Sequence, residues 1–350
     1  MADKKGFFKA KKKAGFQKPE FIKHSEEKKL FYSEEDLRWA TNEFVAKHRA
    51  ERLRCDTIAD LGCGIGFQAL TFAKSCNKVI AVDIDEKRLG NAKKNAEVLG
   101  AKNIEFILGD ALDSEVVKKL SKADIVFCDP ERKPEEEERS VSSTKPDVKK
   151  IVEKYSKVTS ALAIEVPPQI KSIPFDCEKE YASVEGKLNR LTLYFGALKR
   201  CDRSAVILPQ GSVLRSNSEA LLTKTEEIFH YLYEADPSVA KAGLLAELSV
   251  ETGTMLFEEA KQTFFTSDKF VKSDFFKNSF EVLEKCEFDE KKIVEALNKQ
   301  GACKVLIRFS VDPKDYWKVR KTYENQTQGD KELCLFKFGS NAVVAKILMS

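Results

Sequence analysis

The sequence predicts an α/β protein, a Rossmann-like seven-stranded sheet with a leading helix, followed by a smaller C-terminal α+β domain. Three observations support this. Short apolar runs alternate with helical stretches between residues 57 and 208, an order typical of a parallel sheet covered on both faces. A turn with three glycines follows the first run. The pattern then changes near residue 279 into a compact strand and helix alternation of its own. A chain of 350 residues is long enough for two packed domains.

The leading helix is predicted over residues 33–53, with Ser33 as its N-cap and Asp36 three residues later. Seven strands are expected after it, at 57–61, 78–83, 104–108, 124–128, 160–166, 188–195 and 204–208. Helices are expected between them at 67–74, 86–99, 114–120 and 146–157. The last two strands are separated only by a short connection, so we expect them to form an antiparallel pair at one edge of the sheet.

The remaining sequence divides the chain into four parts. Residues 1–30 are predicted to be a basic, disordered tail, and residues 31–215 the α/β domain. Residues 216–278 are interpreted as a helical connector, and residues 279–350 as an α+β domain with the order βαβαββ and an antiparallel sheet.

Charge is concentrated in the tail. Residues 1–30 hold ten lysines and four acids, a net charge of +6, whereas the whole chain carries +4, so the rest sums to −2. A solvated tail is one interpretation. The other is a tail that meets phosphate groups through lysine and stacks Phe7, Phe8 and Phe16 on bases.

Composition excludes several classes of protein. Hydrophobic residues make up 42% and charged residues 33% of the chain, and no run approaches the roughly 18 apolar residues of a membrane span. The N-terminus lacks the apolar segment of a secretory leader. Nine scattered cysteines, never spaced as CxxC, argue against a disulfide framework and a zinc finger. We therefore expect a cytoplasmic protein with reduced thiols, no metal site and no membrane partner.

The segment ADLGCGIGFQAL carries the strongest chemical signal. A buried strand ends at Asp60, and Gly62, Gly64 and Gly66 follow, where backbone must turn tightly and allow a ligand to approach. The spacing alone does not exclude a dinucleotide, since the looser form counted from Gly64 ends in Ala69. A carboxylate at the strand end, however, suits an ammonium group and repels a pyrophosphate. S-adenosylmethionine carries such an ammonium group.

Two further acids follow the next two strands. Asp83 ends the second strand, 21 positions after Gly62, where a carboxylate can accept both hydroxyls of a ribose. Asp110 follows the third strand and can accept an adenine amino group, while Ala111 leaves room for the ring. Taken alone, Asp83 could instead be an N-terminal acid of the next helix, and Asp110 a plain turn. The three acids in order favour S-adenosylmethionine as the cofactor.

These motifs resemble a known family. ADLGCGIG, AVDID, LGDA and FCDPER are similar to the motifs of class I S-adenosylmethionine-dependent methyltransferases. AKHRAERL, DPERK and YLYEADPSVAKAGLLAEL resemble, more narrowly, methyltransferases that end in a THUMP-like domain. The resemblance covers nearly all of the chain after residue 30, resting on motifs in its first half and mostly on pattern in its last 70 residues. THUMP domains proper bind RNA in RNA-modifying enzymes, so the resemblance implies an RNA substrate, such as structured tRNA or rRNA.

The acceptor side of the reaction is assigned to the segment after the fourth strand. Asp129 follows that strand, and Pro130 stiffens the turn. Enzymes that methylate amines often carry D/N-P-P-Y/F here, with the aromatic ring stacking a flipped base. This chain has Glu131 and Arg132 instead, which weakens the case for an exocyclic amine as the methylated group. Under this hypothesis Asp129 is the acceptor or general base and Arg132 orients the substrate; the alternative is a turn that merely closes a strand.

A cysteine nucleophile is a further alternative. Cys201 lies beside Lys199, Arg200 and Arg203, which would lower the pKa of its thiol if those charges converge. It falls between the last two predicted strands, however, away from the inferred ligand edge.

The C-terminal domain offers a candidate RNA surface. Lys318, Arg320 and Lys321 share a predicted helix with Trp317 and two tyrosines, a mixture that suits phosphate contact and base stacking. An amphipathic helix that buries its aromatic rings and solvates its lysines is the alternative interpretation.

Three functions remain open from the sequence. The first is an RNA methyltransferase. The second is an RNA-binding protein that keeps the cofactor fold without the chemistry, an interpretation that the DPER departure keeps open. The third is a methyltransferase of a small molecule or a protein.

Overall fold

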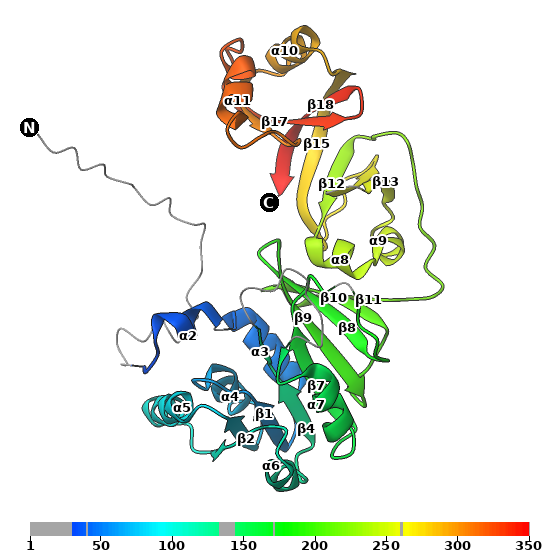
Figure 1. Ribbon diagram of the computed structural model, residues 1–350. Helices are drawn as coiled ribbons and strands as arrows, with labels where there is room; N and C mark the ends of the chain where they lie inside the picture. Colours follow the sequence, from blue (N-terminus) through cyan, green and yellow to red (C-terminus); the bar gives the residue numbers. More distant parts are fainter. Residues whose placement is uncertain (1–29, 40, 133–143, 171, 260–261, 350) are drawn as a thin grey trace, which may run out of the picture. The chain divides into compact units, whose positions relative to one another are not determined.

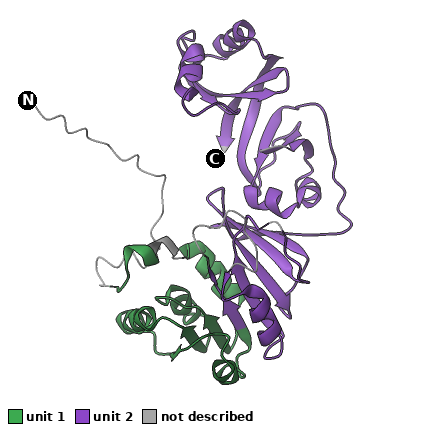
Figure 2. Cartoon of the chain, viewed as in Figure 1, with its two compact units in different colours: residues 1–125 green, residues 126–350 purple. Residues whose placement is uncertain are grey.

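The computed structural model describes residues 30–39, 41–132, 144–170, 172–259 and 262–349 (Figure 1). The predicted basic tail therefore lies outside the described residues, apart from Leu30. By contacts the chain divides into two compact units, residues 1–125 and 126–350 (Figure 2). The predicted parts of residues 1–30 and 31–215 stay predictions, whereas residues 216–278 do not form a separate helical part.

The first unit alternates helices and strands after two leading helices. Its elements are α2 (Glu34–Trp39), α3 (Glu43–Arg52), β1 (Thr57–Leu61), α4 (Phe67–Phe72), β2 (Lys78–Asp83), α5 (Glu86–Leu99), β3 (Ile104–Leu108) and α6 (Ser114–Lys119). Strands β1, β2 and β3 pair in parallel, as predicted. Strands β1 and β2 are buried apart from Thr57 and Lys78, as expected of strands covered on both faces, whereas β3, at the edge of the sheet, buries only Ile107.

The single leading helix predicted over residues 33–53 is wrong. Ser33 does cap α2, since its Oγ accepts the Asp36 N–H at 3.2 Å while the Asp36 carboxylate accepts the Ser33 N–H at 2.7 Å. The chain then starts a second helix at Asn42, whose Oδ1 accepts the Phe44 N–H at 2.9 Å. An asparagine side chain competes with the helical backbone for hydrogen bonds, so it favours a new helix start over continuation.

The second unit completes this sheet and adds another. Its first elements are β4 (Ile125–Cys128, which begins at the last residue of the first unit), β5 (Glu131–Arg132), β6 (Thr144–Lys145), α7 (Val148–Tyr155), β7 (Ala161–Val166), β8 (Glu178–Val184), β9 (Lys187–Gly196), β10 (Arg203–Leu208) and β11 (Ser212–Arg215). The large sheet has the strand order β11-β10-β8-β9-β7-β4-β1-β2-β3, nine strands where seven were predicted. The α/β fold class is confirmed.

The predicted antiparallel edge pair is wrong. Strand β8, which the sequence analysis missed, lies between β9 and β10, pairing antiparallel with β9 and parallel with β10. The reversed hairpin is therefore β8–β9, closed by Glu185 and Gly186 with φ of 50° and 67°. Positive φ at both central residues is the geometry of the tight turn that matches strand twist. Strand β11 forms the outer edge.

The C-terminal sheet has seven strands in the order β13-β14-β12-β15-β18-β17-β16. Its elements are β12 (Tyr231–Ala235), α8 (Pro237–Ala242), α9 (Leu245–Thr252), β13 (Met255–Glu259), β14 (Thr263–Ser267), β15 (Phe276–Glu287), α10 (Glu290–Lys299), β16 (Ala302–Ile307), α11 (Tyr316–Glu324), β17 (Lys331–Phe338) and β18 (Asn341–Met349). The order βαβαββ predicted for residues 279–350 is confirmed.

Two other predictions for the C-terminal half of the chain are wrong. Residues 216–278 are not a helical connector, because they hold β12, β13 and β14, which belong to the C-terminal sheet. The sheet is also not wholly antiparallel, since β16 and β17 pair in parallel. Helices α10 and α11 pack on a core that includes Ile293, Leu297 and Leu335, as expected for an α+β layer.

No helix among the described residues is long and apolar enough to cross a membrane. All nine cysteines lie in described parts of the chain and are free thiols, five of them buried and four half-buried.

Candidate functional site

The glycine loop joins β1 to α4 in the first unit. Gly62, Gly64 and Gly66 have φ of 76°, 55° and 87°, a backbone conformation that residues with a Cβ rarely adopt. At Gly66 a Cβ would also meet the Cβ of Ala92 at 3.0 Å, whereas nothing lies within 4 Å of one added at Gly64. The loop therefore has both the conformation and, at Gly64, the open space that close approach of a ligand requires.

Asp83, at the end of β2, is tied to this loop. Its Oδ2 accepts the Gly64 N–H at 2.6 Å and its Oδ1 accepts the Asp85 N–H at 2.8 Å, and the residue is 7% exposed. A carboxylate has about four acceptor positions, so each oxygen keeps one beyond these bonds. Asp60, at the end of β1, is buried. The structure thus brings Asp83 and the glycine loop together, as the order of the motifs predicted.

Asp110 and Ala111 follow β3 at the same edge. The Gly109 N–H donates to the Asp83 carbonyl at 3.0 Å, which fixes the start of this turn beside β2. Asp110 is exposed and its Oδ1 accepts the Leu112 N–H at 2.8 Å, while Ala111 is buried.

Sequence reasoning missed two apolar side chains at this edge. Ile84 is 72% exposed and Leu108 is 52% exposed, directly after and at the end of neighbouring parallel strands. A large apolar side chain exposed beside polar ligand groups is suited to cover one face of a flat ring. The sequence did contain a signal for Ile84 and Leu108, since both residues extend an apolar strand segment beyond its buried part.

Asn95 is a second residue that the sequence analysis missed. It lies on α5 and is fully buried; its Nδ2 donates to the carbonyls of Ile65 and Phe31, at 3.0 and 3.1 Å, and its Oδ1 accepts the Phe31 N–H at 2.7 Å. It therefore fixes the glycine loop to α5 and to the segment before α2. A polar residue between Ala92 and Ala96 on the buried face of a helix was the signal.

We expect Asn95→Ala to lower the free energy of unfolding of this unit by about 2 to 3 kcal/mol, because the buried Ile65 carbonyl and two part-buried backbone groups of Phe31 lose their partner. Urea unfolding followed by hydrogen exchange of residues 57–108 measures this. Asn91→Ala, on the same helix and only half-buried, is the control and should change stability by less than about 0.5 kcal/mol. Equal stability of the two variants would contradict the role given to Asn95.

The predicted acceptor residues follow β4 in the second unit. Asp129 is half-buried and Pro130 is buried. Glu131 and Arg132 form β5, which pairs with β6 in the register Arg132↔Thr144. This pairing fixes the backbone direction after the DP turn. The side chain of Arg132 and the acidic run at 135–138 lie outside the described residues.

Cys201 is not activated in the way that its neighbours suggested. Burial raises the pKa of its thiol, and the adjacent Glu178 carboxylate raises that pKa further. A raised pKa leaves less thiolate, so Cys201 does not fit a nucleophile.

The helix α11 carries the predicted basic residues, but not as three equivalent cations. Lys318 and Lys321 are exposed, whereas Arg320 pairs with Glu324 at 2.6 Å and lies over the Trp317 ring. Trp317 is 63% exposed, and Tyr323 is buried in the core. The surface available to a ligand therefore consists of two lysines and one tryptophan held in place by an arginine.

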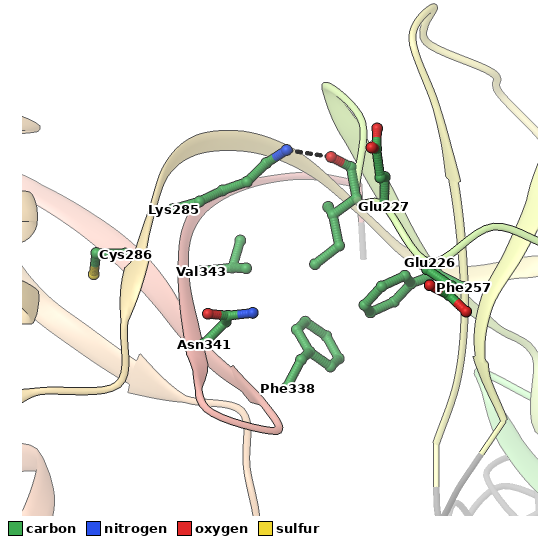
Figure 3. A pocket seen from close by; sticks show the side chains of 9 residues that line it. Glu226, Glu227, Phe257, Lys285, Cys286, Phe338, Asn341 and Val343 are labelled. Carbon is green, nitrogen blue, oxygen red and sulfur yellow. Dashed lines mark hydrogen bonds between the residues drawn. The ribbon is translucent and has the colours of Figure 1, made fainter.

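A separate hollow of about 350 Å³ opens on the C-terminal sheet (Figure 3). It is lined by Glu226, Glu227, Ile228, Phe257, Lys285, Cys286, Phe338, Asn341 and Val343. The Lys285 ammonium group donates to the Ile228 carbonyl, and Figure 3 marks this bond with a dashed line from Lys285. Two exposed carboxylates at such a hollow repel phosphate, so we do not place an RNA backbone there. No group of three side chains suited to a metal ion occurs among the described residues.

Comparison with known proteins assigns the α/β domain. Residues 55–184, from just before β1 to the end of β8, match the family described as "Methyltransferase domain". Residues 55–184 thus match a methyltransferase domain, as the motifs predicted. An S-adenosylmethionine-dependent methyltransferase of Mycobacterium tuberculosis is 24% identical over 292 residues, which are 81% of this chain and 78% of that protein. The cofactor expected for this methyltransferase is S-adenosylmethionine.

Two further comparisons concern the fold and a partial relative. The crystal structure of a methyltransferase from Porphyromonas gingivalis superposes with a TM-score of 0.71 at 16% identity, covering 91% of this chain and 83% of that one. The likeness in fold thus extends over both sheets of the chain. A protein of Caldanaerobacter subterraneus named as an RNA methyltransferase is 41% identical over 80 residues, 22% of this chain and 17% of its own.

Proposed function

We propose that this methyltransferase transfers the methyl group of S-adenosylmethionine to a base of a structured RNA, such as tRNA or rRNA. The observation that carries the proposal is the hydrogen bond between the glycine loop and the Asp83 carboxylate, next to the exposed side chains of Ile84 and Leu108. This arrangement fits a ligand with a polar chain, a ribose and a flat ring. The assignment of the domain supports the same ligand.

The residues of the first unit bind the cofactor in this proposal. Backbone at Gly62–Gly66 holds its amino-acid part, with the Asp60 carboxylate as the counter-charge of the ammonium group. Asp83 accepts the two ribose hydroxyls through its remaining lone pairs. Asp110 accepts a hydrogen bond from the adenine amino group. Ala111, Ile84 and Leu108 cover the adenine ring. When bound, S-adenosylmethionine supplies the electrophilic methyl group.

The chemistry left to the protein is small. Methyl transfer from a sulfonium is an in-line displacement, so orientation of the acceptor and removal of its proton supply most of the catalysis. Asp129, half-buried at the end of β4, is the general base in this proposal, and Pro130 fixes its position. Arg132 orients the substrate. The carboxyl ends of parallel strands are where α/β sheets bind ligands, which favours this assignment.

Several features support RNA as the substrate. Partial relatives are named RNA methyltransferases, among them the one of Caldanaerobacter subterraneus described above. The C-terminal domain, which the sequence analysis compared with THUMP-like domains, presents Trp317 next to Lys318 and Lys321. An exposed indole between ammonium groups suits base stacking combined with phosphate contact.

We expect the pair Lys318→Glu and Lys321→Glu to weaken RNA binding about tenfold or more and to reduce its salt dependence. Both ammonium groups are exposed and would release counterions from phosphates. Filter binding of unmethylated tRNA or rRNA at several salt concentrations measures both quantities. The matched control is Lys272→Glu with Lys291→Glu, two exposed lysines elsewhere in the same domain. An equal effect in both pairs would mean that charge alone, not α11, determines binding.

One experiment separates the three functions. RNA from cells in which the gene is deleted is analysed by mass spectrometry for one missing methylated nucleoside, and the purified protein is then tested for restoring it with S-adenosylmethionine. Restoration supports the proposal. RNA crosslinking without any missing nucleoside would favour an RNA-binding protein without the chemistry, and neither result would favour a small-molecule or protein substrate. A cytoplasmic location stays a prediction.

A further inference from the structure

Three neighbouring strands of the second unit bring charged residues to one edge of the large sheet. Strands β4 and β7 pair in parallel, and their last registered pair is Cys128↔Ile164. The residues that follow are Asp129 and Glu165, so these two acids come level with one another at the carboxyl ends. Registered residues of paired strands share a face, and both strands are apolar up to this point.

The third strand adds a guanidinium group. Strands β7 and β9 pair antiparallel, with Glu165 opposite Thr192. Arg190 lies two residues before Thr192, hence on the same face and nearer the carboxyl edge of β7. Its Nε forms an ion pair with the Glu165 carboxylate, and its Nη1 donates to the Asn189 carbonyl at 3.3 Å.

Burial differs between the two partners of this ion pair. The Glu165 side chain is 5% exposed, whereas that of Arg190 is 26% exposed. An arginine has five N–H donors in a rigid plane. In Arg190 the Nη1 is hydrogen-bonded, and the buried Nε is in ion-pair contact with Glu165 without a hydrogen bond among the described residues. The guanidinium is thus fixed in orientation with donors left for a ligand, which is the arrangement expected of a recognition group rather than of a solvated surface arginine.

We propose that Arg190, held by Glu165, is a second group that recognises the acceptor base. It donates hydrogen bonds to a carbonyl oxygen or ring nitrogen beside the methylated atom, while Asp129 accepts from the base. The inference rests on the proposed function and adds a specificity residue to it. The chemistry favours a base over a phosphate, because the buried carboxylate already balances the arginine charge, and a neutral acceptor needs direction more than charge.

Glu165 has a different role from Arg190. It is a positioning residue, because its burial removes it from the acceptor while its carboxylate holds the guanidinium in place by charge. A lysine at position 190 could not replace this function, since an ammonium group lacks the planar fork that both the carboxylate and a base edge require.

The test compares Arg190→Met and Arg190→Lys with Arg215→Met as the matched control. Arg215 is exposed on the edge strand β11, where it pairs with Ser204 at the opposite end of the sheet. Methyl transfer is measured on RNA from cells in which the gene is deleted. We expect kcat/KM to fall roughly 10- to 100-fold in both Arg190 variants and to stay within twofold in Arg215→Met.

Binding measurements on the same variants identify the atom that Arg190 contacts. A base contact leaves the affinity for S-adenosylmethionine and the salt slope of RNA binding unchanged. A salt slope that falls by about one would assign Arg190 to a phosphate and overturn the base contact. Equal kcat/KM in Arg190→Met and Arg215→Met would overturn the proposal altogether.

A double-mutant cycle tests the positioning role. Glu165→Leu is expected to lower kcat/KM when Arg190 is present and to add less than twofold in the Arg190→Met background, with Glu165→Gln restoring part of the rate. Additive losses would contradict positioning. If Glu165→Leu does not fold, as judged by its Tm, the Arg190 variants alone decide. A wild-type protein that transfers no methyl group to RNA would refute the proposed function, whereas an active wild type with an equally active Arg190→Met would refute only this inference.

Discussion

Asp129→Asn is expected to lower the rate of methyl transfer about 100- to 10 000-fold, the range in which positioned general bases contribute. The amide keeps the size of the side chain but cannot take up a proton from the acceptor. In the described part of the chain Asp129 makes no hydrogen bond to the Gly62–Gly66 loop, which binds the cofactor in our proposal. The dissociation constant for S-adenosylmethionine should therefore stay within about twofold. Single-turnover transfer to RNA and calorimetry of cofactor binding measure the two quantities.

The matched control for Asp129→Asn is Asp176→Asn. Asp176 is exposed in the same unit and forms only a surface ion pair with Lys199, a type of pair that contributes little to stability. Its rate should be that of the wild type. If Asp129→Asn retains most of its rate, Asp129 has no part in proton removal, and its turn only closes β4. If instead cofactor affinity falls with the rate, the substitution has disturbed the fold.

The sequence predicted best where one requirement determined the residue. Positive φ at Gly62, Gly64 and Gly66 requires glycine, so the loop was identified without a structure. The apolar strands before and after it were equally clear, because a sheet buried on both faces leaves an uninterrupted apolar run. In these regions local sequence and global fold agree, which is the condition under which reading from sequence succeeds.

Strand β8 was missed because its buried face is acidic. Glu178 accepts the Ser204 hydroxyl at 2.6 Å, and Glu180 accepts the Tyr194 hydroxyl at 3.0 Å. These partners lie on the neighbouring strands β9 and β10, which come later in the sequence. A charged residue that appears exposed from the sequence is therefore buried and hydrogen-bonded in the fold. The same reason concealed Glu165 and Arg190. The local signal for this hairpin was Gly186, since a glycine readily adopts the positive φ that the turn at Glu185–Gly186 has in the structure.

The site residues were predicted in position but not in their bonding. The order of the motifs placed Asp83 and Asp110 at neighbouring strand ends, as found. It could not show that Asp83 already bonds the Gly64 backbone, nor that Arg320 is paired with Glu324 rather than available to RNA. Side-chain pairing across a sheet or along a helix depends on rotamers, which spacing does not determine.

Asp83→Asn is expected to raise the dissociation constant for S-adenosylmethionine about 100-fold. A hydrogen bond to a charged group contributes roughly 1.5 to 3 kcal/mol, and the ribose offers two hydroxyls. The amide also places an NH₂ group against the N–H of either Gly64 or Asp85, both of which need an acceptor. The substitution therefore weakens the ribose contact and the loop that holds the rest of the cofactor. Calorimetry with S-adenosylmethionine and with its demethylated by-product measures the change.

Two comparison variants separate these contributions. Asp110→Asn removes a single exposed contact and should raise the dissociation constant only about 5- to 10-fold. Glu105, on β3, forms an exposed ion pair with Lys78 on β2, and Glu105→Gln should leave the dissociation constant unchanged. A folded Asp83→Asn protein that binds both ligands within threefold of the wild type would show that the carboxylate serves the loop alone. The cofactor would then have to be held without Asp83, and the assignment of the three acids would lose its central member.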